Sequence, residues 1–427
     1  MRSWPTRFVN AIGASFALCA FTLGSSSAQV FTTILQFDGA HGAQPQASLV
    51  QGGDGYLYGT TTSGGDLTCG GGSGCGTVFR MSLSGQLTVL HTFTGEDGAS
   101  PWGRLVLGMD GNFYGTTYQG GDLNCNPPGG CGTVFKITPE GELTILHTFE
   151  FADGTSPVSG LVQASGDNFY GTASAGGNDV CDSLAGCGTV FEISPNGTFR
   201  KLYGFSGSDG AMPTVALLLA RDGSFYGTTF FGGSYDCDGT YGCGTVFKMS
   251  TRGRLTTLHT FDLSDGAFPG AAFVEGPDNG LYSTSSGGGK YNLGTVFKST
   301  RSGAITLLHH FRGGDGALPY DPLIVGTDGN VYGTAYYGGS YGCSAPHGCG
   351  TVFQITRHDR FTKVHRFNGK DGSAPFGALI QATNGVFYGT TSQGANKSCF
   401  LGGCGTVFSL DMGLRPSVQQ VPRQWNH

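Results

Sequence analysis

The stretch Phe113–Lys136, FYGTTYQGGDLNCNPPGGCGTVFK, decides the fold of this chain because it returns along the sequence in seven recognisable copies. Its tyrosine recurs at intervals of 56, 56, 56, 56, 50 and 56 residues, as Tyr58, Tyr114, Tyr170, Tyr226, Tyr282, Tyr332 and Tyr388. A fixed period through nearly all of 427 residues favours one repeat array over several unrelated domains. We therefore expect a single domain over residues 29–411.

The composition supports short strands and tight turns. Glycine accounts for 78 of the 427 residues and charged residues for only 12%, which suits turns between strands and does not suit charged helices. The formal net charge is −6 and no basic cluster is present. Because nucleic acid is held through its phosphates by clustered lysine and arginine, we expect no nucleic-acid partner.

Alternation and turn residues place four short strands in each period. In the second copy we expect strands over Gly103–Leu107, Asn112–Tyr118, Gly132–Ile137 and Leu143–Phe149. Alternation along the last of these predicts one shared face for Leu143, Ile145, His147 and Phe149. Turns such as Asp110-Gly111 supply the positive φ that two-residue hairpins require.

Repeated four-stranded meanders predict an all-β fold, a seven-bladed β-propeller with four antiparallel strands in each blade. A linear β-solenoid is the main alternative, but it requires capping units at both ends. The sequence instead opens with a lone strand of the fourth type, Phe31–Phe37, and its last repeat stops after three strands, at Gly405–Leu410. The first strand is therefore expected to complete the last blade and close the ring.

The repeated motifs YGTT, GG, GTVFK and DGAxP resemble those of the secreted GloVer tandem-repeat proteins, named for Gloeobacter and Verrucomicrobia. The resemblance covers Phe31 to Leu410. It implies an exported bacterial repeat protein of the choice-of-anchor type. It implies no catalytic residue, because no activity is established for the family, and the sequence shows no C-terminal anchor of the family's kind.

The first residues predict a signal peptide over residues 1–28. A basic start is followed by an apolar stretch and by small residues before a cleavage site after Ala28. A retained membrane anchor is less favoured because Asn10 interrupts the apolar stretch, and lipid attachment at Cys19 is less favoured because Leu18 is bulky. We expect a secreted, periplasmic or cell-surface monomer without an integral membrane segment, with an unstructured tail at residues 412–427.

Twelve of the thirteen cysteines fall in pairs, one pair in every repeat except the fifth. An even number in an exported chain predicts disulfides, and pairing within each loop is the simplest connectivity. The expected pairs are Cys69 with Cys75, Cys125 with Cys131, Cys181 with Cys187, Cys237 with Cys243, Cys343 with Cys349, and Cys399 with Cys404. Two thiols lack the other two ligands of tetrahedral zinc, so we expect no metal and no cofactor.

Two polar residues recur with the repeat. An acid stands four residues before a proline at Asp97, Asp153, Asp209, Asp265, Asp315 and Asp371, and a histidine recurs at His91, His147, His259, His309 and His365. A repeated calcium or sugar site is one interpretation of the acids, but a side chain capping its own turn is favoured. The histidines are expected to be hydrogen-bonded packing positions and not bases or metal ligands.

The residues that break the repeat are the candidates for function. The loops of the fourth and sixth repeats carry Phe230, Phe231, Tyr235, Tyr241, Tyr336, Tyr337, Tyr341 and His347, and unique residues at the start of the innermost strands are Trp102, Arg104, Tyr320 and Asp321. Aromatic side chains suit stacking on sugar rings or anchoring of a protein partner. Packing beneath their own loops is an equally weighted alternative.

These features predict a non-enzymatic exported protein that binds glycan or extracellular protein, or serves a structural envelope role, through a disulfide-braced loop face. The alternative is a secreted carbohydrate-active enzyme, a hydrolase or lyase at the mouth of the central channel, with Asp321 as the acid or base and Arg104 steadying an anionic substrate. The sequence shows no nucleophile motif and no phosphate-binding loop.

Overall fold

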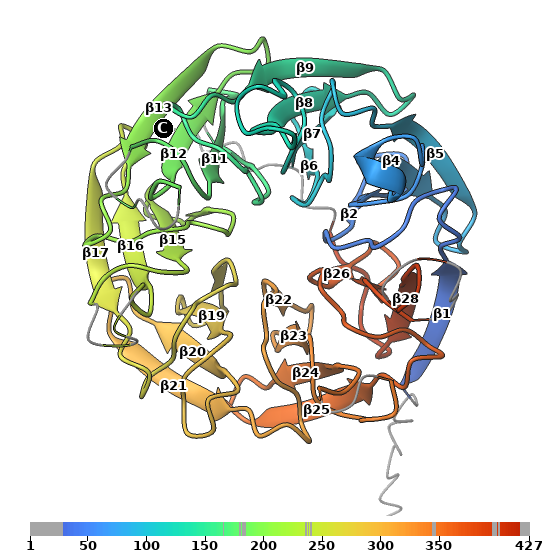
Figure 1. Cartoon of the computed structure of the whole chain (residues 1–427). Coiled ribbons are helices and arrows are strands. Elements are labelled where there is room, and N and C mark those ends of the chain that lie inside the picture. Colours follow the sequence, from blue (N-terminus) through green and yellow to red (C-terminus); the bar gives the residue numbers. More distant parts are fainter. Residues whose placement is uncertain are drawn as a thin grey trace, which may run out of the picture.

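The computed structural model describes residues 29–418 except 165, 179–180, 182–184, 235–236, 238, 240, 344–346, 395–398 and 400–401. In this part of the chain the strands form seven sheets of four antiparallel strands each, arranged as blades around one axis (Figure 1). The seven-bladed β-propeller predicted from the period is confirmed.

The blades follow one another along the chain. Blade 1 contains β2 (Val50–Gln51), β3 (Leu57–Thr61), β4 (Thr77–Met81) and β5 (Leu87–Thr92), with a short 3-10 helix, η1 (Gly70–Gly72), in its loop. Blade 2 contains β6 (Val106–Leu107), β7 (Phe113–Thr117), β8 (Thr133–Ile137) and β9 (Leu143–Thr148). Blade 3 contains β10 (Val162–Gln163), β11 (Phe169–Ala173), β12 (Thr189–Ile193) and β13 (Phe199–Gly204). Blade 4 contains β14 (Leu218–Leu219), β15 (Phe225–Thr229), β16 (Thr245–Met249) and β17 (Leu255–Thr260).

The remaining three blades complete the ring. Blade 5 contains β18 (Val274–Glu275), β19 (Leu281–Ser285), β20 (Thr295–Ser299) and β21 (Ile305–His310). Blade 6 contains β22 (Ile324–Val325), β23 (Val331–Ala335), β24 (Thr351–Ile355) and β25 (Phe361–Arg366). Blade 7 contains β26 (Ile380–Gln381), β27 (Phe387–Thr391), β28 (Thr406–Asp411) and β1 (Val30–Gln36).

The ring is closed by its first strand. β1 pairs antiparallel with β28, from Val30 opposite Asp411 to Gln36 opposite Thr406, so the predicted closure is confirmed. Beyond β28 the chain stays against the propeller, since the amide of Gln381 donates to the Arg415 carbonyl at 3.3 Å and the Ser417 hydroxyl donates to the Gln381 carbonyl at 2.9 Å. The contacts of the propeller therefore extend past residue 411.

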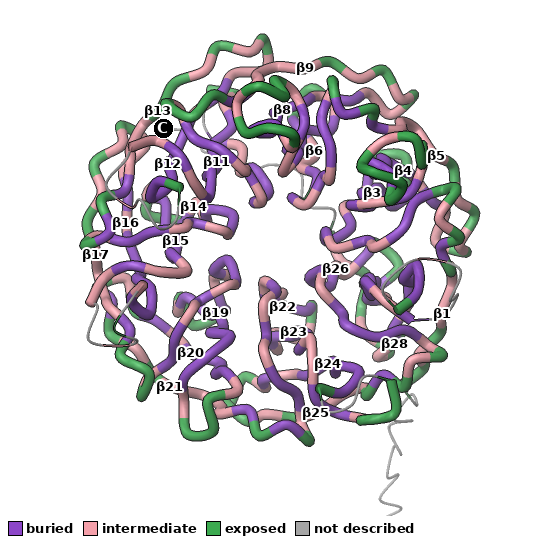
Figure 2. Tube along the Cα trace, in the orientation of Figure 1, coloured by how far each residue is buried: buried purple, intermediate pink, exposed green. Residues whose placement is uncertain are grey.

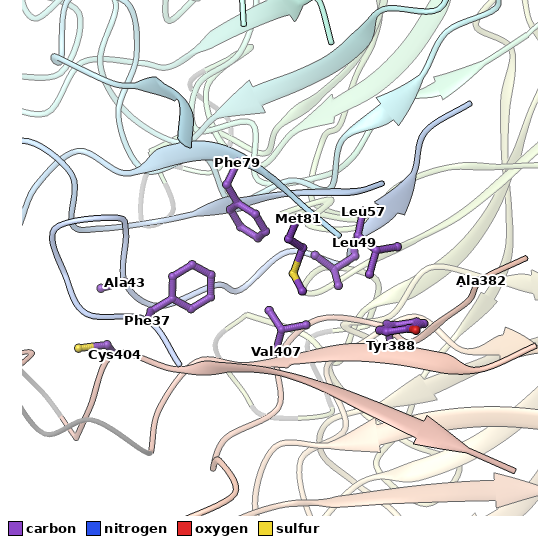
Figure 3. Packing of buried hydrophobic residues seen from close by; sticks show 10 residues of the cluster. All are labelled: Phe37, Ala43, Leu49, Leu57, Phe79, Met81, Ala382, Tyr388, Cys404 and Val407. Carbon is purple, nitrogen blue, oxygen red and sulfur yellow. The ribbon is translucent and has the colours of Figure 1, made fainter. Parts of the chain in front are cut away.

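The core lies between neighbouring blades. At the junction of blades 7 and 1, Phe79 and Met81 from β4 face Val407 from β28, with Phe37 beside them (Figure 3). The middle strands β3, β4 and β28 are almost wholly buried, whereas the outer strands and loops contain the exposed residues (Figure 2). Since burial of apolar area is the main stabilising term in folding, each blade depends on its two neighbours for stability.

The tyrosine that marks the repeat fixes a turn. In blade 2 the Tyr114 hydroxyl donates to Asp110 Oδ2 at 2.7 Å, while Asp110 Oδ1 accepts the backbone N–H of Asn112 at 3.1 Å. The same bond joins Tyr58 to Asp54, Tyr226 to Asp222, Tyr282 to Asp278, and Tyr332 to Asp328. Burial and the bond to Asp54 raise the pKa of Tyr58 to about 12, so the hydroxyl remains a donor at neutral pH.

The predicted faces of the outer strand are wrong. In β9, Ile145 pairs with Phe135 and His147 pairs with Val134, so Leu146 is an extra residue in a β-bulge. The bulge reverses the alternation. Leu143 and Ile145 pack toward blade 1, whereas Phe149 packs toward blade 3.

The innermost strands are shorter than predicted. β6 covers only Val106 and Leu107, although the sequence predicts a strand from Gly103. The residues before β6, which include Trp102 and Arg104, lie outside the ladder, and β6 is on the inner side of its blade (Figure 1). This unpaired segment, present in each blade, supplies the residues nearest the axis.

Candidate functional site

The long loops and the connectors between blades form one face of the ring. In the connector that follows β5, Ala99 pairs with Gln119 in the loop of blade 2, and Ser100 N donates to the Cys75 carbonyl in the loop of blade 1 at 2.8 Å. The connector is therefore held between the loops of two neighbouring blades. We call this face the loop face, and the opposite face, with its hairpin turns, the turn face.

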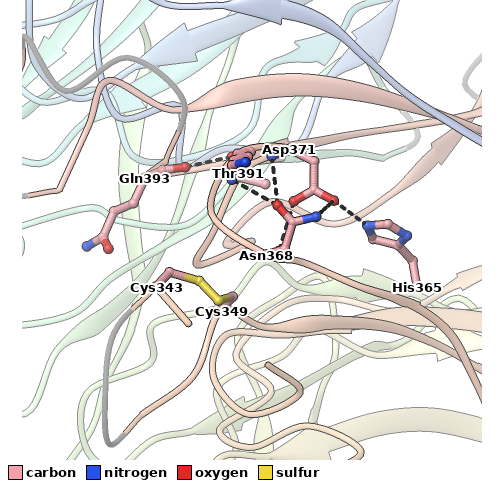
Figure 4. The surroundings of a disulfide bond; sticks show 8 residues. Cys343, Cys349, His365, Asn368, Asp371, Thr391 and Gln393 are labelled. Atoms are coloured by element: carbon pink, nitrogen blue, oxygen red, sulfur yellow. Dashed lines mark hydrogen bonds and ion pairs between the residues drawn. A yellow bond between two sulfur atoms is a disulfide. The ribbon is translucent and has the colours of Figure 1, made fainter. Parts of the chain in front are cut away.

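All six predicted disulfides form within their own loops, with Cα–Cα distances of 5.1 to 5.7 Å. The second cysteine of each pair is buried between blades, and Cys131 is 0% exposed. The first cysteine lies over a connector, since Cys343 Sγ is 3.5 Å from where a Cβ on Gly369 would stand (Figure 4). In blade 5, which lacks the pair, Leu293 packs into the inter-blade core.

The recurrent histidines and the recurrent aspartates form hydrogen bonds with each other. His365 Nε2 lies 3.1 Å from Asp371 Oδ2, and Asp371 Oδ1 accepts the N–H of Asn368 at 2.9 Å (Figure 4). The same clasp joins His91 to Asp97, His147 to Asp153, His259 to Asp265, and His309 to Asp315, and Tyr203 takes the place of histidine opposite Asp209. Turn capping and histidine packing account for these residues without a ligand.

Near the axis of the loop face, aromatic side chains from separate blades meet. The Trp102 ring lies 5.4 Å from the Tyr118 ring and 6.2 Å from the Phe376 ring of blade 7. Phe376 stacks with Tyr320 of blade 6 at 5.8 Å and meets Tyr336 edge to face at 5.5 Å. All five side chains are half-buried.

A second aromatic group adjoins the first. Phe230 lies 4.9 Å from Phe231 and stacks at 5.5 Å with Phe268 of the next connector. Gly270 connects the groups, because a Cβ placed on it would lie 3.2 Å from Tyr320 Cδ1 and 3.7 Å from Phe230 Cε2. We call the combined surface the aromatic patch, and it consists of Trp102, Tyr118, Phe230, Phe231, Tyr241, Phe268, Tyr320, Tyr336, Tyr337 and Phe376.

The other aromatic candidates lie at the edge of this patch or away from it. Tyr337 contacts Tyr336 at 4.5 Å and stacks with His347 at 4.9 Å. Tyr341 is 54% exposed, and its hydroxyl lies 3.0 Å from the Cβ position of Gly313 in a connector. Tyr235 lies outside the described residues.

Arg104 stands beside the axis, two residues beyond Trp102. It is exposed, and its side chain crosses Gly160 of blade 3, because a Cβ on that glycine would lie 2.5 Å from Arg104 Cγ. The surrounding ring of protein lowers the pKa of Arg104 through partial desolvation. Because arginine stays protonated in proteins even when its pKa is lowered, the guanidinium remains a cation at neutral pH.

Asp321, unlike Arg104, is not accessible to a ligand. It is 3% exposed, and the Thr334 hydroxyl donates to its Oδ2 at 2.9 Å. Burial raises the pKa of Asp321 well above its ordinary value. In other blades the equivalent threonine bonds a carbonyl of the next blade, as Thr116 does with Ser159 at 3.0 Å.

Sequence reasoning missed three members of the patch: Tyr118, Phe268 and Phe376. Phe376 occupies the same repeat position as Trp102 and Tyr320, directly after the connector proline, so aligning the repeats residue by residue would have found it. No comparable signal marks Phe268, which joins the patch only because blades 4 and 5 are neighbours.

Other kinds of site have little support in the described part of the chain. Among these residues, no three His, Cys, Asp or Glu side chains gather in a way that could hold a metal ion. A small hollow between blades 7 and 1, lined by Leu35, His41 and Leu87, lies at the outer rim and away from the aromatic patch. Within residues 29–418, as far as they are described, no helix is long and apolar enough to cross a membrane.

Solved structures similar to this chain share its fold at low sequence identity. The extracellular domain of a hybrid two-component system from B. thetaiotaomicron has 11% identity and a TM-score of 0.53, and the match covers 89% of this chain and 40% of that one. The periplasmic gluconolactonase of Pseudomonas aeruginosa has 18% identity and a TM-score of 0.49, covering 76% of this chain and 85% of that one. The first similarity shows the fold alone, and the second carries no functional argument.

Comparison at the level of sequence identifies the family. No curated protein matches the chain. The model of the Gloeobacter/Verrucomicrobia repeat matches residues 13–240 and 214–421, in two overlapping tandem regions that span nearly all of the propeller. The motifs of the repeat form the strands, turns and connectors described above, and the chain belongs to the Gloeobacter/Verrucomicrobia repeat family.

Proposed function

We propose that this protein is an exported, non-catalytic binding protein that holds a glycan against the aromatic patch of its loop face. The observation that carries the proposal is that half-buried rings from blades 2, 4, 5, 6 and 7 form one continuous surface beside the axis. Aromatic faces with polar edges suit sugar rings, which present apolar C–H faces and polar rims. Rings braced by one another lose little conformational entropy when a ligand binds.

Export is part of the proposal. Disulfides persist in oxidising compartments, and this chain has six of them. The basic and apolar residues before Ala28 are typical of a secretory signal. Both features favour a secreted, periplasmic or cell-surface location.

Binding is favoured over turnover because of Asp321, the residue that the sequence predicts as the general acid or base. Its carboxyl is 3% exposed and already bonded to Thr334, whereas a general acid or base must reach the proton that it transfers.

A glycan array with the purified mature protein tests the proposal, and each retained glycan is then assayed for reducing-end release and unsaturated products. We expect retention without turnover. Trp102→Ala and Tyr320→Ala should each weaken binding about tenfold or more. Tyr56→Ala serves as the matched control, because Tyr56 is 40% exposed on the turn face. No retention on the array, or equal binding by all three variants, would contradict the proposal.

A further inference from the structure

In the described segments between each connector proline and the innermost strand, Arg104 is the single exposed charge. The repeat places one residue of each blade at the same level as Arg104. The others are Ser48, Gly160, Ala216, Ala272, Pro322 and Ala378. These residues are small or apolar, and Val215, Ala216 and Ala272 pack together as an apolar cluster. None of the six equivalent positions therefore offers Arg104 a counter-charge.

Arg104 is also without a partner among the described residues, since neither a hydrogen bond nor an ion pair of its guanidinium is found there. The other charged residue in the segments that precede the innermost strands is Asp321 on blade 6, which is buried and bonded to Thr334. Asp321 thus does not neutralise the arginine. An exposed guanidinium beside apolar walls interacts with an anion more strongly than one on an open surface, because the local dielectric is lower.

The backbone places Arg104 next to the aromatic patch. Gly103, between Trp102 and Arg104, packs so closely that a Cβ on it would lie 2.5 Å from the Ser159 carbonyl of blade 3. From this fixed point Trp102 extends toward Phe376 of blade 7, while Arg104 crosses Gly160 of blade 3. The chain thus holds Arg104 two residues from Trp102, a member of the aromatic patch, with Gly103 fixed between them.

We propose that the glycan is acidic, and that Arg104 binds its carboxylate or sulfate group while the aromatic patch holds the sugar rings. This inference rests on the proposed function and adds the chemical class of the ligand. The planar guanidinium forms two parallel hydrogen bonds with either anion, so carboxylate and sulfate are both suitable. Gly160 is a positioning residue in this arrangement, because its lack of a side chain leaves room for Arg104.

The test compares acidic and neutral polysaccharides by isothermal titration calorimetry. The probes are polygalacturonate and alginate for carboxylate, dextran sulfate for sulfate, and methyl-esterified pectin and dextran as neutral counterparts. We expect the wild type to prefer an acidic probe. Tighter binding of either the carboxylated or the sulfated polysaccharide then identifies the anion. Binding of that probe should weaken as salt rises, because salt screens the charge interaction.

The variants isolate the role of Arg104. Arg104→Gln should lower the affinity for the acidic probe about 10- to 100-fold and the affinity for neutral probes much less. Arg104→Lys keeps the charge but loses the planar fork, so an intermediate loss is expected. Gly160→Ala changes no charge and should also weaken binding, because the new methyl displaces the arginine. Arg252→Gln is the control, since Arg252 is exposed in a hairpin turn of the turn face.

The outcomes separate the two proposals. Equal binding of acidic and neutral glycans, unaffected by Arg104→Gln, overturns the acidic class while glycan binding stands. Retention of no polysaccharide overturns the proposed function and this inference with it. Thermal unfolding midpoints confirm that each variant is folded, and if Arg104→Gln were to unfold, Gly160→Ala and the salt dependence of the wild type still decide the question.

Discussion

The rim and the axis of this propeller differ in how strictly they repeat. We call the parts of each blade outside its innermost strand the rim, and there the histidine–aspartate clasp recurs in five blades and the disulfide in six. At the axis, Trp102, Arg104 and Asp321 each occur once. Residues that serve packing are needed wherever the same junction recurs, whereas residues that bind one ligand are needed once. The comparison assigns stability to the rim and the blade junctions, and specificity to the axis.

The largest expected effect is at a blade junction. Phe135 is 0% exposed and meets Phe93 edge to face at 5.4 Å. Phe135→Ala should lower the free energy of unfolding by about 3–5 kcal/mol through lost burial and a new cavity. Denaturant titration measures this loss, with Tyr341→Ala, at a site 54% exposed, as the control expected to change little. Similar losses of stability in both variants would contradict the conclusion that the blade junctions contribute more to stability than the exposed surface.

A smaller effect is expected at the disulfides. Replacing Cys125 and Cys131 by serine opens a short loop, which costs about 2 kcal/mol by the chain-entropy account. Blade 5 keeps its fold with Leu293 in place of the pair, so the variant should fold and bind normally. Denaturant midpoints of the variant and of the reduced wild type measure the effect. A loss of glycan binding in this variant would show that rim and axis are coupled.

Breaking the histidine–aspartate clasp should destabilise the fold by an amount that depends on pH. Although burial opposes it, hydrogen bonds from His91 and Thr94 lower the pKa of Asp97 below its ordinary value. The lowered pKa stabilises the fold above the unfolded-state pKa, and this stabilisation is lost as pH falls through the folded pKa. Asp97→Asn should therefore cost about 1–2 kcal/mol at pH 7 and progressively less below pH 4. A cost independent of pH would contradict the lowered pKa of Asp97.

The smallest effect on stability is expected at Asp321, where the substitution should stabilise the fold instead of destabilising it. Burial raises the pKa of Asp321, so the folded state holds the proton more tightly than the unfolded state, and this stabilisation is lost as pH rises through the folded pKa. Asp321→Asn keeps an acceptor for Thr334 without a titrating group. The variant should match the wild type near pH 4 and become the more stable protein as pH rises. Thermal unfolding from pH 4 to pH 9 measures this divergence, and a variant less stable at every pH would contradict it.

The architecture could be predicted because its signals are local. The period of the YGTT tyrosine counts the blades, and the lone strand at Phe31–Phe37 identifies the closing strand. The paired cysteines lie within single loops, so their connectivity needs no knowledge of the ring. The bulge at Leu146 could not be predicted, because it exists only in the pairing between β8 and β9.

The candidate site could be predicted only in part. Trp102 and Tyr320 are visible in the sequence because they break the repeat. Their joint contact with Phe376 is not visible, since the period says which blades are neighbours and not where their rings point. The same limit applies to Asp321, whose position beside the axis suggests a catalytic group although its side chain faces Thr334.

The pairing of β1 with β28 also determines the order in which the ring can be completed. β1 leaves the ribosome before every other strand of the propeller, yet its partner at residues 406–411 is made after all the rest. Until then both edges of the open array are unpaired, and unpaired edges recruit other chains. Completion of the fold is therefore a late event at one seam, and a chain truncated before residue 406 would carry all seven repeat tyrosines and still lack a closed ring.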